Sequence, residues 1–345
     1  MRTAPDGGLM REQVLDQVPS PSLGSLYARA LGRTARAAAP GMLSGGPSPT
    51  TLPQVCYTVP RVPVDHAHLA EYQHLLGEAG TDELPAGYVH VLGFPLAMNL
   101  MVRADFPLPV LGMVHVANRV EQFHPLSTTD TLRVQARAQG LRAHRSGTQV
   151  DLVVEVAAQE GPEVAWRGVS TYLAKGTTLP GLALAEPVKA GQDGSTGSGE
   201  AVDDGDSGAA GSGHSRGGAG GNDAGGRGVL PEATAVWRLT PRTGRRYAAV
   251  SGDRNPIHMS ALSARAFGFP RAIAHGMYTA ARALAAVGPA RGPAFTWQID
   301  FAKPVLLPST VSFGQARTDS GTYTYAGWKA GSDRVHFTGS VRPLP

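Results

Sequence analysis

The sequence is poor in the residues that define several classes of protein. Its 345 residues include one cysteine, Cys56, which excludes an internal disulfide framework and a cysteine-rich metal site. Aromatic residues make up only 6% of the chain and charged residues 17%. No run of about eighteen consecutive apolar residues occurs, so the sequence predicts no membrane-spanning helix.

The charge balance says little about partners. Lys and Arg number 31 against 27 Asp and Glu, for a formal net charge of +4 and a pI near 9.3. This excess suits a phosphorylated or acidic ligand but is too small to indicate nucleic-acid binding. Near the N-terminus, Asp6, Glu12 and Asp16 interrupt the place where the apolar region of a signal peptide would lie. Together with the lone cysteine, these features predict a cytoplasmic protein.

Composition divides the chain into four segments. Residues 191–228 hold about a third of the 44 glycines and almost no large apolar residue, a composition that cannot bury enough surface to fold. The sequence predicts, in this order, a partly disordered N-terminal extension (1–55), a first domain (56–178), a flexible linker (179–230) and a second domain (231–345). Helical spacing over residues 23–31 predicts a short helix in the extension, on the outside of the first domain or on a membrane surface; we favour the first.

The two domains have matching patterns of hydrophobicity. Strands with alternating polarity are predicted over 114–123, 130–134, 149–157 and 164–174 in the first half, and over 295–301, 309–313, 323–329 and 335–341 in the second. Each set follows a helix that is apolar nearly all round, 88–101 and 275–287, as is typical of a buried helix. One buried helix wrapped by an antiparallel sheet, occurring twice, predicts an α+β double hot-dog fold. We expect a monomeric pseudo-dimer or a homodimer.

The residues that carry chemistry concentrate in the second half. Alone, residues 251–256 would be typical of a turn followed by a helix start. His258 follows Asp253 by five residues, however, and places an imidazole where both side chains can act on one water. Gly276 begins the buried helix, where a backbone N–H can hold a developing negative oxygen. This set predicts the addition or removal of water beside a carbonyl.

The stretch Ser251-Gly-Asp-Arg-Asn-Pro-Ile-His258, followed by His275-Gly-Met277, resembles the signature of the MaoC-like (R)-specific enoyl-CoA hydratase/dehydratase family. The resemblance covers about residues 231–345. It implies that Asp253 and His258 are the catalytic pair and that the N–H of Gly276 holds the thioester oxygen. The residues it places in the substrate pocket are Ser251, Asn255, His275 and Met277. Many members have an acidic residue two positions after the histidine, where this chain has Ser260.

The first half is similar to the degenerate N-terminal hot-dog unit of two-domain (3R)-hydroxyacyl-thioester dehydratases. The matching elements are Gly93-Phe94-Pro95, Phe106-Pro107, Gly112-x-x-His115 and Asn118-Arg119. Because this half has no Asp-x-Asn-Pro-x-His stretch, we expect no chemistry there, and His115 is interpreted as structural or as lining the site. Gly93, Ala97 and Met98 on its helix are candidates to line an acyl channel, with ordinary helix packing as the alternative.

These observations predict a (3R)-hydroxyacyl-thioester dehydratase or (R)-specific enoyl-CoA hydratase of fatty-acid metabolism, acting on CoA or acyl-carrier-protein thioesters. No metal is expected, because the histidines do not cluster at ligand spacing. No dinucleotide cofactor is expected either, since no glycine-rich loop opens a helix after a strand. Two alternatives remain: a hot-dog acyl-CoA thioesterase and a non-catalytic acyl-thioester-binding protein. An intact Asp253–His258 pair argues against the second.

Overall fold

The computed structural model describes residues 2–3, 9–18, 49–159, 161, 163–184 and 230–345. The helix expected over 23–31 and nearly all of the glycine-rich linker lie outside these residues. The described residues up to 184 and from 231 onward belong to one unit. The boundaries assigned to the two domains therefore stay predictions.

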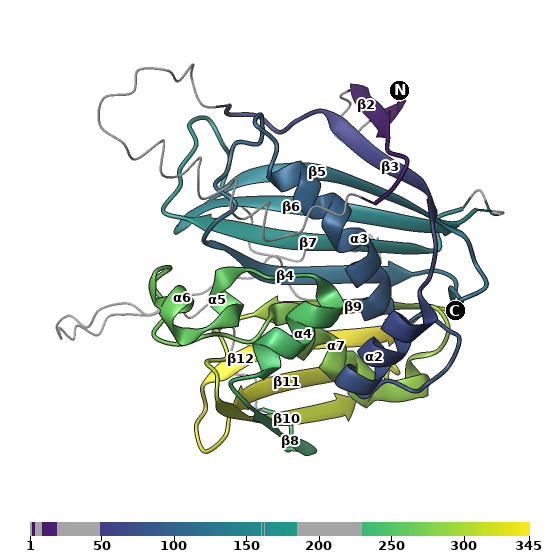
Figure 1. Cartoon of the computed structure of the whole chain (residues 1–345). Coiled ribbons are helices and arrows are strands. Elements are labelled where there is room, and N and C mark those ends of the chain that lie inside the picture. Colours follow the sequence, from purple (N-terminus) through teal and green to yellow (C-terminus); the bar gives the residue numbers. More distant parts are fainter. Residues whose placement is uncertain (1, 4–8, 19–48, 160, 162, 185–229) are drawn as a thin grey trace, which may run out of the picture. The chain divides into compact units, whose positions relative to one another are not determined.

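A 12-stranded sheet runs through both halves (Figure 1). In spatial order, the first half contributes β3 (Val55–Val62), β5 (Leu132–His144), β6 (Gly147–Ala158), β7 (Trp166–Lys175) and β4 (Met113–Gln122). The second half continues with β9 (Phe295–Phe301), β12 (Val335–Pro343), β11 (Tyr323–Lys329), β10 (Ser309–Arg317) and β8 (Ala235–Leu239). Counted outward from the junction of β4 and β9, corresponding strands of the two halves thus follow in the same order. The halves join where β4 pairs with β9 in antiparallel register, from Ala117↔Asp300 to Gln122↔Phe295.

The predicted strands are confirmed, most of them with bounds that differ by a few residues. β5 continues ten residues beyond its predicted end, and β3 and β8 were not predicted. The N-terminal extension, for which no strand was predicted, adds β1 (Arg2–Thr3) and β2 (Leu9–Val14) to the sheet. β2 pairs in parallel with β3, and Glu12 accepts a 2.7 Å hydrogen bond from the hydroxyl of Thr58. An alternation rule misses β2 because its three polar residues, Arg11, Glu12 and Gln13, follow one another without alternation.

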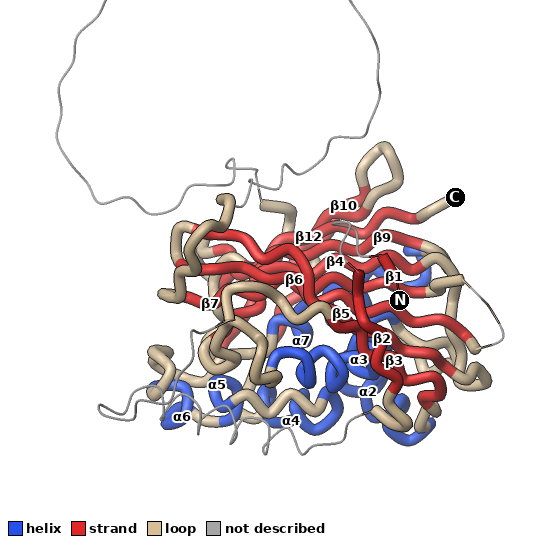
Figure 2. Tube along the Cα trace, turned by 90° about the horizontal axis from the view of Figure 1, so that it is seen from above, coloured by secondary structure: helices blue, strands red, loops and turns tan. Residues whose placement is uncertain are grey.

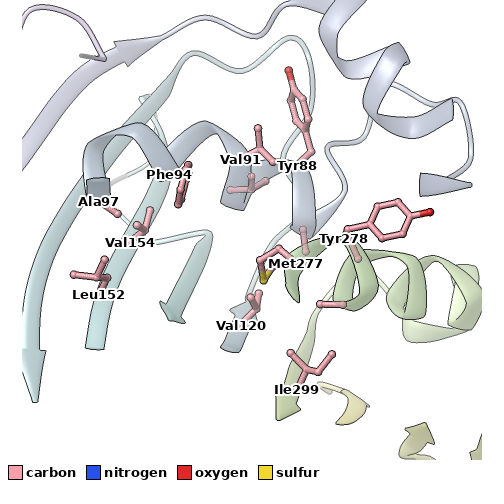
Figure 3. Close-up of a cluster of buried hydrophobic side chains, with 14 of the residues drawn as sticks. Tyr88, Val91, Phe94, Ala97, Val120, Leu152, Val154, Met277, Tyr278 and Ile299 are labelled. Carbon is pink, nitrogen blue, oxygen red and sulfur yellow. The ribbon is translucent and has the colours of Figure 1, made fainter. Parts of the chain in front are cut away.

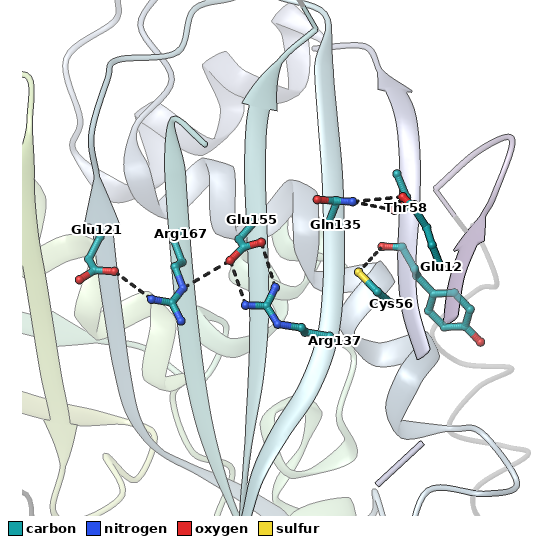
Figure 4. Close-up of polar contacts among 9 residues, drawn as sticks. Glu12, Cys56, Thr58, Glu121, Gln135, Arg137, Glu155 and Arg167 are labelled. Atoms are coloured by element: carbon teal, nitrogen blue, oxygen red, sulfur yellow. Dashed lines mark hydrogen bonds and ion pairs between the residues drawn. The ribbon is translucent and has the colours of Figure 1, made fainter. Parts of the chain in front are cut away.

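Charged side chains on neighbouring strands pair across the sheet face that lies away from the helices (Figure 4). Arg137 binds Glu155 through two 2.9 Å hydrogen bonds. Arg167 lies 3.5 Å from Glu155 and 3.3 Å from Glu121. The alternate residues on these strands point to the opposite face and are buried, as Val120 and Val154 show. The sheet therefore has one polar face and one face that carries the core.

The helices gather on the apolar face of the sheet (Figure 2). The longer ones are α2 (His66–Leu76), α3 (Ala86–Met101), α4 (Thr243–Ser251) and α7 (Gly276–Val287), and the shorter ones α5 (Pro256–Met259), α6 (Ala261–Arg265) and the 3₁₀ helix η1 (Gly288–Arg291). α3 and α7 confirm the two predicted buried helices. Among the helices of the described residues, none combines the length and hydrophobicity needed to cross a bilayer.

The hydrophobic core extends from one half into the other, with α3 and α7 near its centre (Figure 3). Gly93 packs so closely on β6 that a Cβ atom there would lie 2.5 Å from a methyl carbon of Val154. Ala97 and Met98 are buried in the same core. The acyl channel expected along Gly93, Ala97 and Met98 is therefore wrong at Gly93, where direct packing of helix on sheet leaves no space.

Two polar contacts join the first half to helical segments of the second half. In α2, Nε2 of His68 donates a 2.6 Å hydrogen bond to the carbonyl of Val250 in α4, while Nδ1 lies 3.2 Å from the hydroxyl of Tyr88. In η1, the 3₁₀ helix that follows α7, Arg291 lies 3.4 Å from the buried carboxylate of Glu78. Since α4 leads directly into Asp253, the first half helps to fix where the motif begins.

Candidate active site

The motif forms a tight turn between α4 and α5. α4 ends at Ser251, and Gly252 follows in the left-handed region at φ 71°, which glycine adopts without a steric cost. The N–H of Asp253 donates to the Ser251 hydroxyl at 3.2 Å, and the N–H of Asn255 donates to Oδ1 of Asp253 at 3.1 Å. Local hydrogen bonds therefore fix both the backbone and the carboxylate of Asp253.

The residues after this turn start a new helix. The Asn255 side chain accepts a 3.3 Å hydrogen bond from the N–H of Ile257 and caps α5, with Pro256 at its first position. Ser260 caps α6 by accepting a 3.1 Å bond from the N–H of Ser263. Where many family members have an acidic residue, Ser260 thus supports the loop. The roles of Ser251 and Asn255 visible in the structure are likewise to shape the turn.

The fold brings three of the predicted site residues together. One ligand-type atom of each of Asp253, His258 and His275 lies within 4.8 Å of the others. Nε2 of His275 donates a 2.9 Å hydrogen bond to the backbone carbonyl of Asp253 and lies 3.8 Å from its Oδ2. The rings of His258 and His275 stack with their centroids 3.7 Å apart. His275 therefore positions both members of the predicted pair.

The surroundings of His258 determine its tautomer. Nδ1 lies 2.9 Å from the carbonyl oxygen of Ile273, which can only accept, so Nδ1 carries the proton and Nε2 carries the lone pair. Burial lowers the pKa of His258, and the negative charge of Asp253 and the bond to Ile273 offset only part of this effect. At neutral pH His258 is thus a neutral imidazole with Nε2 available as a base.

Burial, with a smaller contribution from the neighbouring His258, lowers the pKa of His275 to about 3. In the part of the chain that the structure describes, Nδ1 of His275 is buried without a hydrogen-bond partner. His275 is therefore neutral, with its proton on Nε2 for the bond to Asp253.

Two imidazoles and a carboxylate within this distance are also donors that a transition metal can use. The expectation that the histidines do not cluster is wrong in three dimensions, because the two segments fold together. A metal lies in the plane of each imidazole that binds it, however, and the planes of His258 and His275 are only 25° from parallel in a stack. Their nitrogens do not converge on one point, so the three groups do not fit a shared metal.

Gly276 begins α7 directly after His275. The first N–H groups of a helix have no partner within the helix and can bind a negative oxygen. A Cβ atom at this position would lie 2.9 Å from Cζ of Phe301 in β9. Only glycine therefore brings the helix start this close to the ring. The side chain of the next residue, Met277, packs in the core (Figure 3), and its predicted contact with the substrate stays a prediction.

The first half adds three polar side chains to the surroundings of Asp253: His90 on α3, His115 on β4 and Tyr172 on β7. The charge of Asp253 acts on the pKa of each of them, and on that of Tyr247 in α4. Burial is the larger cause in every case; it lowers the pKa of His90 to about 4 and that of His115 to about 3. The His115 ring also lies 5.3 Å from that of Phe301, which packs against Gly276. These side chains therefore form a second wall of the site, of which sequence reasoning had marked only His115.

Three comparisons relate the chain to known proteins. Residues 228–336 match the model of the MaoC like domain. The chain is 36% identical over 285 residues to 3-hydroxyacyl-thioester dehydratase X of Mycobacterium tuberculosis, a match that covers 82% of this chain and 88% of that protein. A crystal structure of HtdX from the same bacterium has a TM-score of 0.65 at 34% identity and covers 84% of this chain and 100% of that one.

A more distant structure, a MaoC-like dehydratase from Phytophthora capsici, has a TM-score of 0.60 at 17% identity. It covers 84% of this chain and 94% of that one and bears on the fold alone. With the strand order described above, these similarities confirm the predicted α+β double hot-dog fold.

Proposed function

The chain belongs to the family of MaoC-like dehydratases and is a hydro-lyase, and we propose that it interconverts (3R)-3-hydroxyacyl thioesters and trans-2-enoyl thioesters. The observation that carries this proposal is the grouping of Asp253, His258 and His275 beside the N-terminus of α7. A neutral imidazole, a carboxylate and a helix start are the groups that reversible loss of water beside a thioester requires.

In the hydration direction, Nε2 of His258 takes a proton from water while the water oxygen bonds to C3. The π electrons move toward the thioester oxygen, C2 then receives a proton from the pair, and one water has been added. The carboxylate of Asp253 stabilises the imidazolium that forms in between, which agrees with its effect on the pKa of His258. A positioned base of this kind contributes about two to four orders of magnitude in rate.

The thioester oxygen becomes negative when C2 takes on carbanion character. We assign its stabilisation to the backbone N–H of Gly276, at the positive end of the α7 dipole. The ring of Phe301 packs closely against Gly276 and covers one side of the helix start. One such donor contributes on the order of a hundredfold to a thousandfold in rate.

The thioester carrier is CoA or acyl carrier protein. Six arginines of the segment around the turn are exposed: Arg242, Arg245, Arg246, Arg254, Arg265 and Arg271. Asp253 is the one acidic residue between positions 240 and 275. This positive surface suits the phosphates that both carriers have.

Incubation with crotonyl-CoA tests the proposal. We expect the enoyl absorbance to fall, with (3R)-hydroxybutyryl-CoA as the product and no release of free thiol. In the reverse direction, the (3R) but not the (3S) hydroxyacyl-CoA should form enoyl-CoA. Free thiol without a hydroxyacyl product would instead identify a thioesterase, and an unchanged substrate would identify a binding protein.

A further inference from the structure

His115 occupies an irregular position on β4, the strand of the first half that borders the second half. The register between β4 and β7 shifts between His115 and Ala117, where one strand carries an extra residue. Such bulges redirect a side chain and are frequent beside active sites. The His115 ring stacks on Tyr172 at a centroid distance of 4.6 Å and lies 5.3 Å from Phe301, the ring that contacts Gly276.

The hydrogen bonds of His115 leave one nitrogen unused. The backbone of Ala117 raises the pKa of His115, which is the effect of a carbonyl that faces a ring N–H. Within the described residues, Nε2 is the nitrogen that is buried without a partner. Since burial keeps His115 neutral, the proton lies on Nδ1 and Nε2 presents a lone pair.

An unpaired acceptor in a buried position costs free energy unless a ligand or a water satisfies it. Between C1 and C3 of a 3-hydroxyacyl thioester, the 3-hydroxyl is the group that carries a donor hydrogen. Phe301 connects His115 to Gly276, which on the proposed function holds the thioester oxygen two carbons away, and the charge of Asp253 reaches His115. The 3-hydroxyl and His115 therefore belong to the same region of the site.

We propose that His115, from the half without the motif, is a substrate-binding residue whose Nε2 accepts a hydrogen bond from the 3-hydroxyl group. With its hydrogen directed to His115, the hydroxyl oxygen turns its lone pairs toward the Asp253–His258 pair, which protonates it as it leaves. In the hydration direction, His115 and His258 each accept one hydrogen of the attacking water. The bond to His115 persists in the product, and the bond to His258 becomes the proton transfer.

The test compares two ligands that differ by this water. Asp253→Asn serves as the parent, because an inactive enzyme binds (3R)-hydroxybutyryl-CoA and crotonyl-CoA without interconverting them, and calorimetry gives both Kd values. Adding His115→Phe, which keeps the ring and removes the acceptor, should weaken binding of the hydroxyacyl-CoA about threefold to tenfold. Binding of crotonyl-CoA should change by less than about twofold. His115→Gln, which offers a new acceptor, should restore part of the loss.

His336→Phe is the matched control. His336 is a buried histidine of β12 with Nδ1 3.2 Å from the carbonyl of Lys303 and with Nε2 buried and unpartnered among the described residues. The side-chain charges acting on its pKa are those of Arg334 and Lys329, so it has the chemistry of His115 in a different place. Added to the Asp253→Asn parent, His336→Phe should leave the Kd values of both thioesters unchanged.

Equal weakening of both ligands by His115→Phe, or no weakening, would overturn the inference. If this variant does not fold, His115→Leu makes the same comparison. The inference rests on the proposed function, yet the two fail differently. An unmutated protein that does not interconvert the two thioesters refutes the function, whereas an active enzyme whose His115→Phe form still binds hydroxyacyl-CoA normally refutes the inference alone.

Discussion

Mild acid should destabilise this protein steeply. Burial lowers the pKa of His90 to about 4 and the pKa values of His115 and His275 to about 3. In the unfolded chain, a histidine titrates near pH 6.5. Between about pH 6.5 and 4, the unfolded state therefore binds more protons than the folded state, and the free energy of unfolding falls as the pH is lowered.

The size of the effect follows from the number of protons. At pH 5 each of the three histidines is almost fully protonated in the unfolded chain and almost fully neutral in the folded one. Three protons correspond to about 4 kcal/mol per pH unit. Glu78 and Asp300, whose pKa values burial raises, bind protons in the folded state and offset part of this slope. Within about two pH units below 6.5, a slope of this size removes several kcal/mol, a large part of a typical stability of about 5–15 kcal/mol.

Urea denaturation followed by tryptophan fluorescence, repeated from pH 7 to pH 5, measures this slope. His90→Phe removes one of the three groups and leaves the Asp253–His258 pair intact, so its slope should be lower by about 1.4 kcal/mol per pH unit, the contribution of one proton. A free energy of unfolding that stays constant over this range, or a His90→Phe slope equal to that of the unmutated protein, would refute the reasoning.

Four further predictions concern the site and the linker. Asp253→Asn and His258→Ala should each remove most turnover with the fold intact, and the double variant should be no slower than the worse single one, because both groups act on one water; multiplied losses in kcat would indicate independent roles. Gly276→Ala should lower kcat on the order of a hundredfold or more, because the new Cβ would displace either Phe301 or the N–H donor; an unchanged kcat would remove Gly276 from catalysis. Deleting residues 194–226, which carry almost no large apolar side chain, should leave Tm and kcat nearly unchanged, and a large loss of both would show that the linker contributes to the fold. Dialysis against EDTA should leave kcat unchanged, because the stacked imidazoles do not fit a shared metal; activity restored only by added metal would contradict this.

Local patterns explain what the sequence could predict. Strict alternation identified β9 and β11 to the residue, and helices that are apolar nearly all round identified α3 and α7. The pair Asp253 and His258 could be predicted for the same reason, because the two residues lie five positions apart and one turn orients both.

The remaining parts of the site depend on contacts that no local pattern contains. The bond from His275 to the carbonyl of Asp253 spans 22 positions, and the stacking of His258 on His275 follows from it. Glycine suits both a helix that packs against a sheet and a helix that lines a channel. Only the space at Gly93 decides between them, because a Cβ atom there would lie 2.5 Å from a methyl carbon of Val154. His115 reaches the site because β4 pairs with β9, and a bulge of one residue aims its ring.

The mirrored strand order accounts for keeping a half that has no motif. Alone, each half would expose the edge of β4 or β9, and an unpaired edge binds other chains. Pairing β4 with β9 removes both edges, and it also brings His115 within 5.3 Å of Phe301. The contact that completes the sheet is thus the one that completes the wall of the site. When the first half supplies this wall for the substrate of the second half, it does not need an Asp-x-Asn-Pro-x-His turn of its own. It does need a buried polar side chain on β4, which is His115.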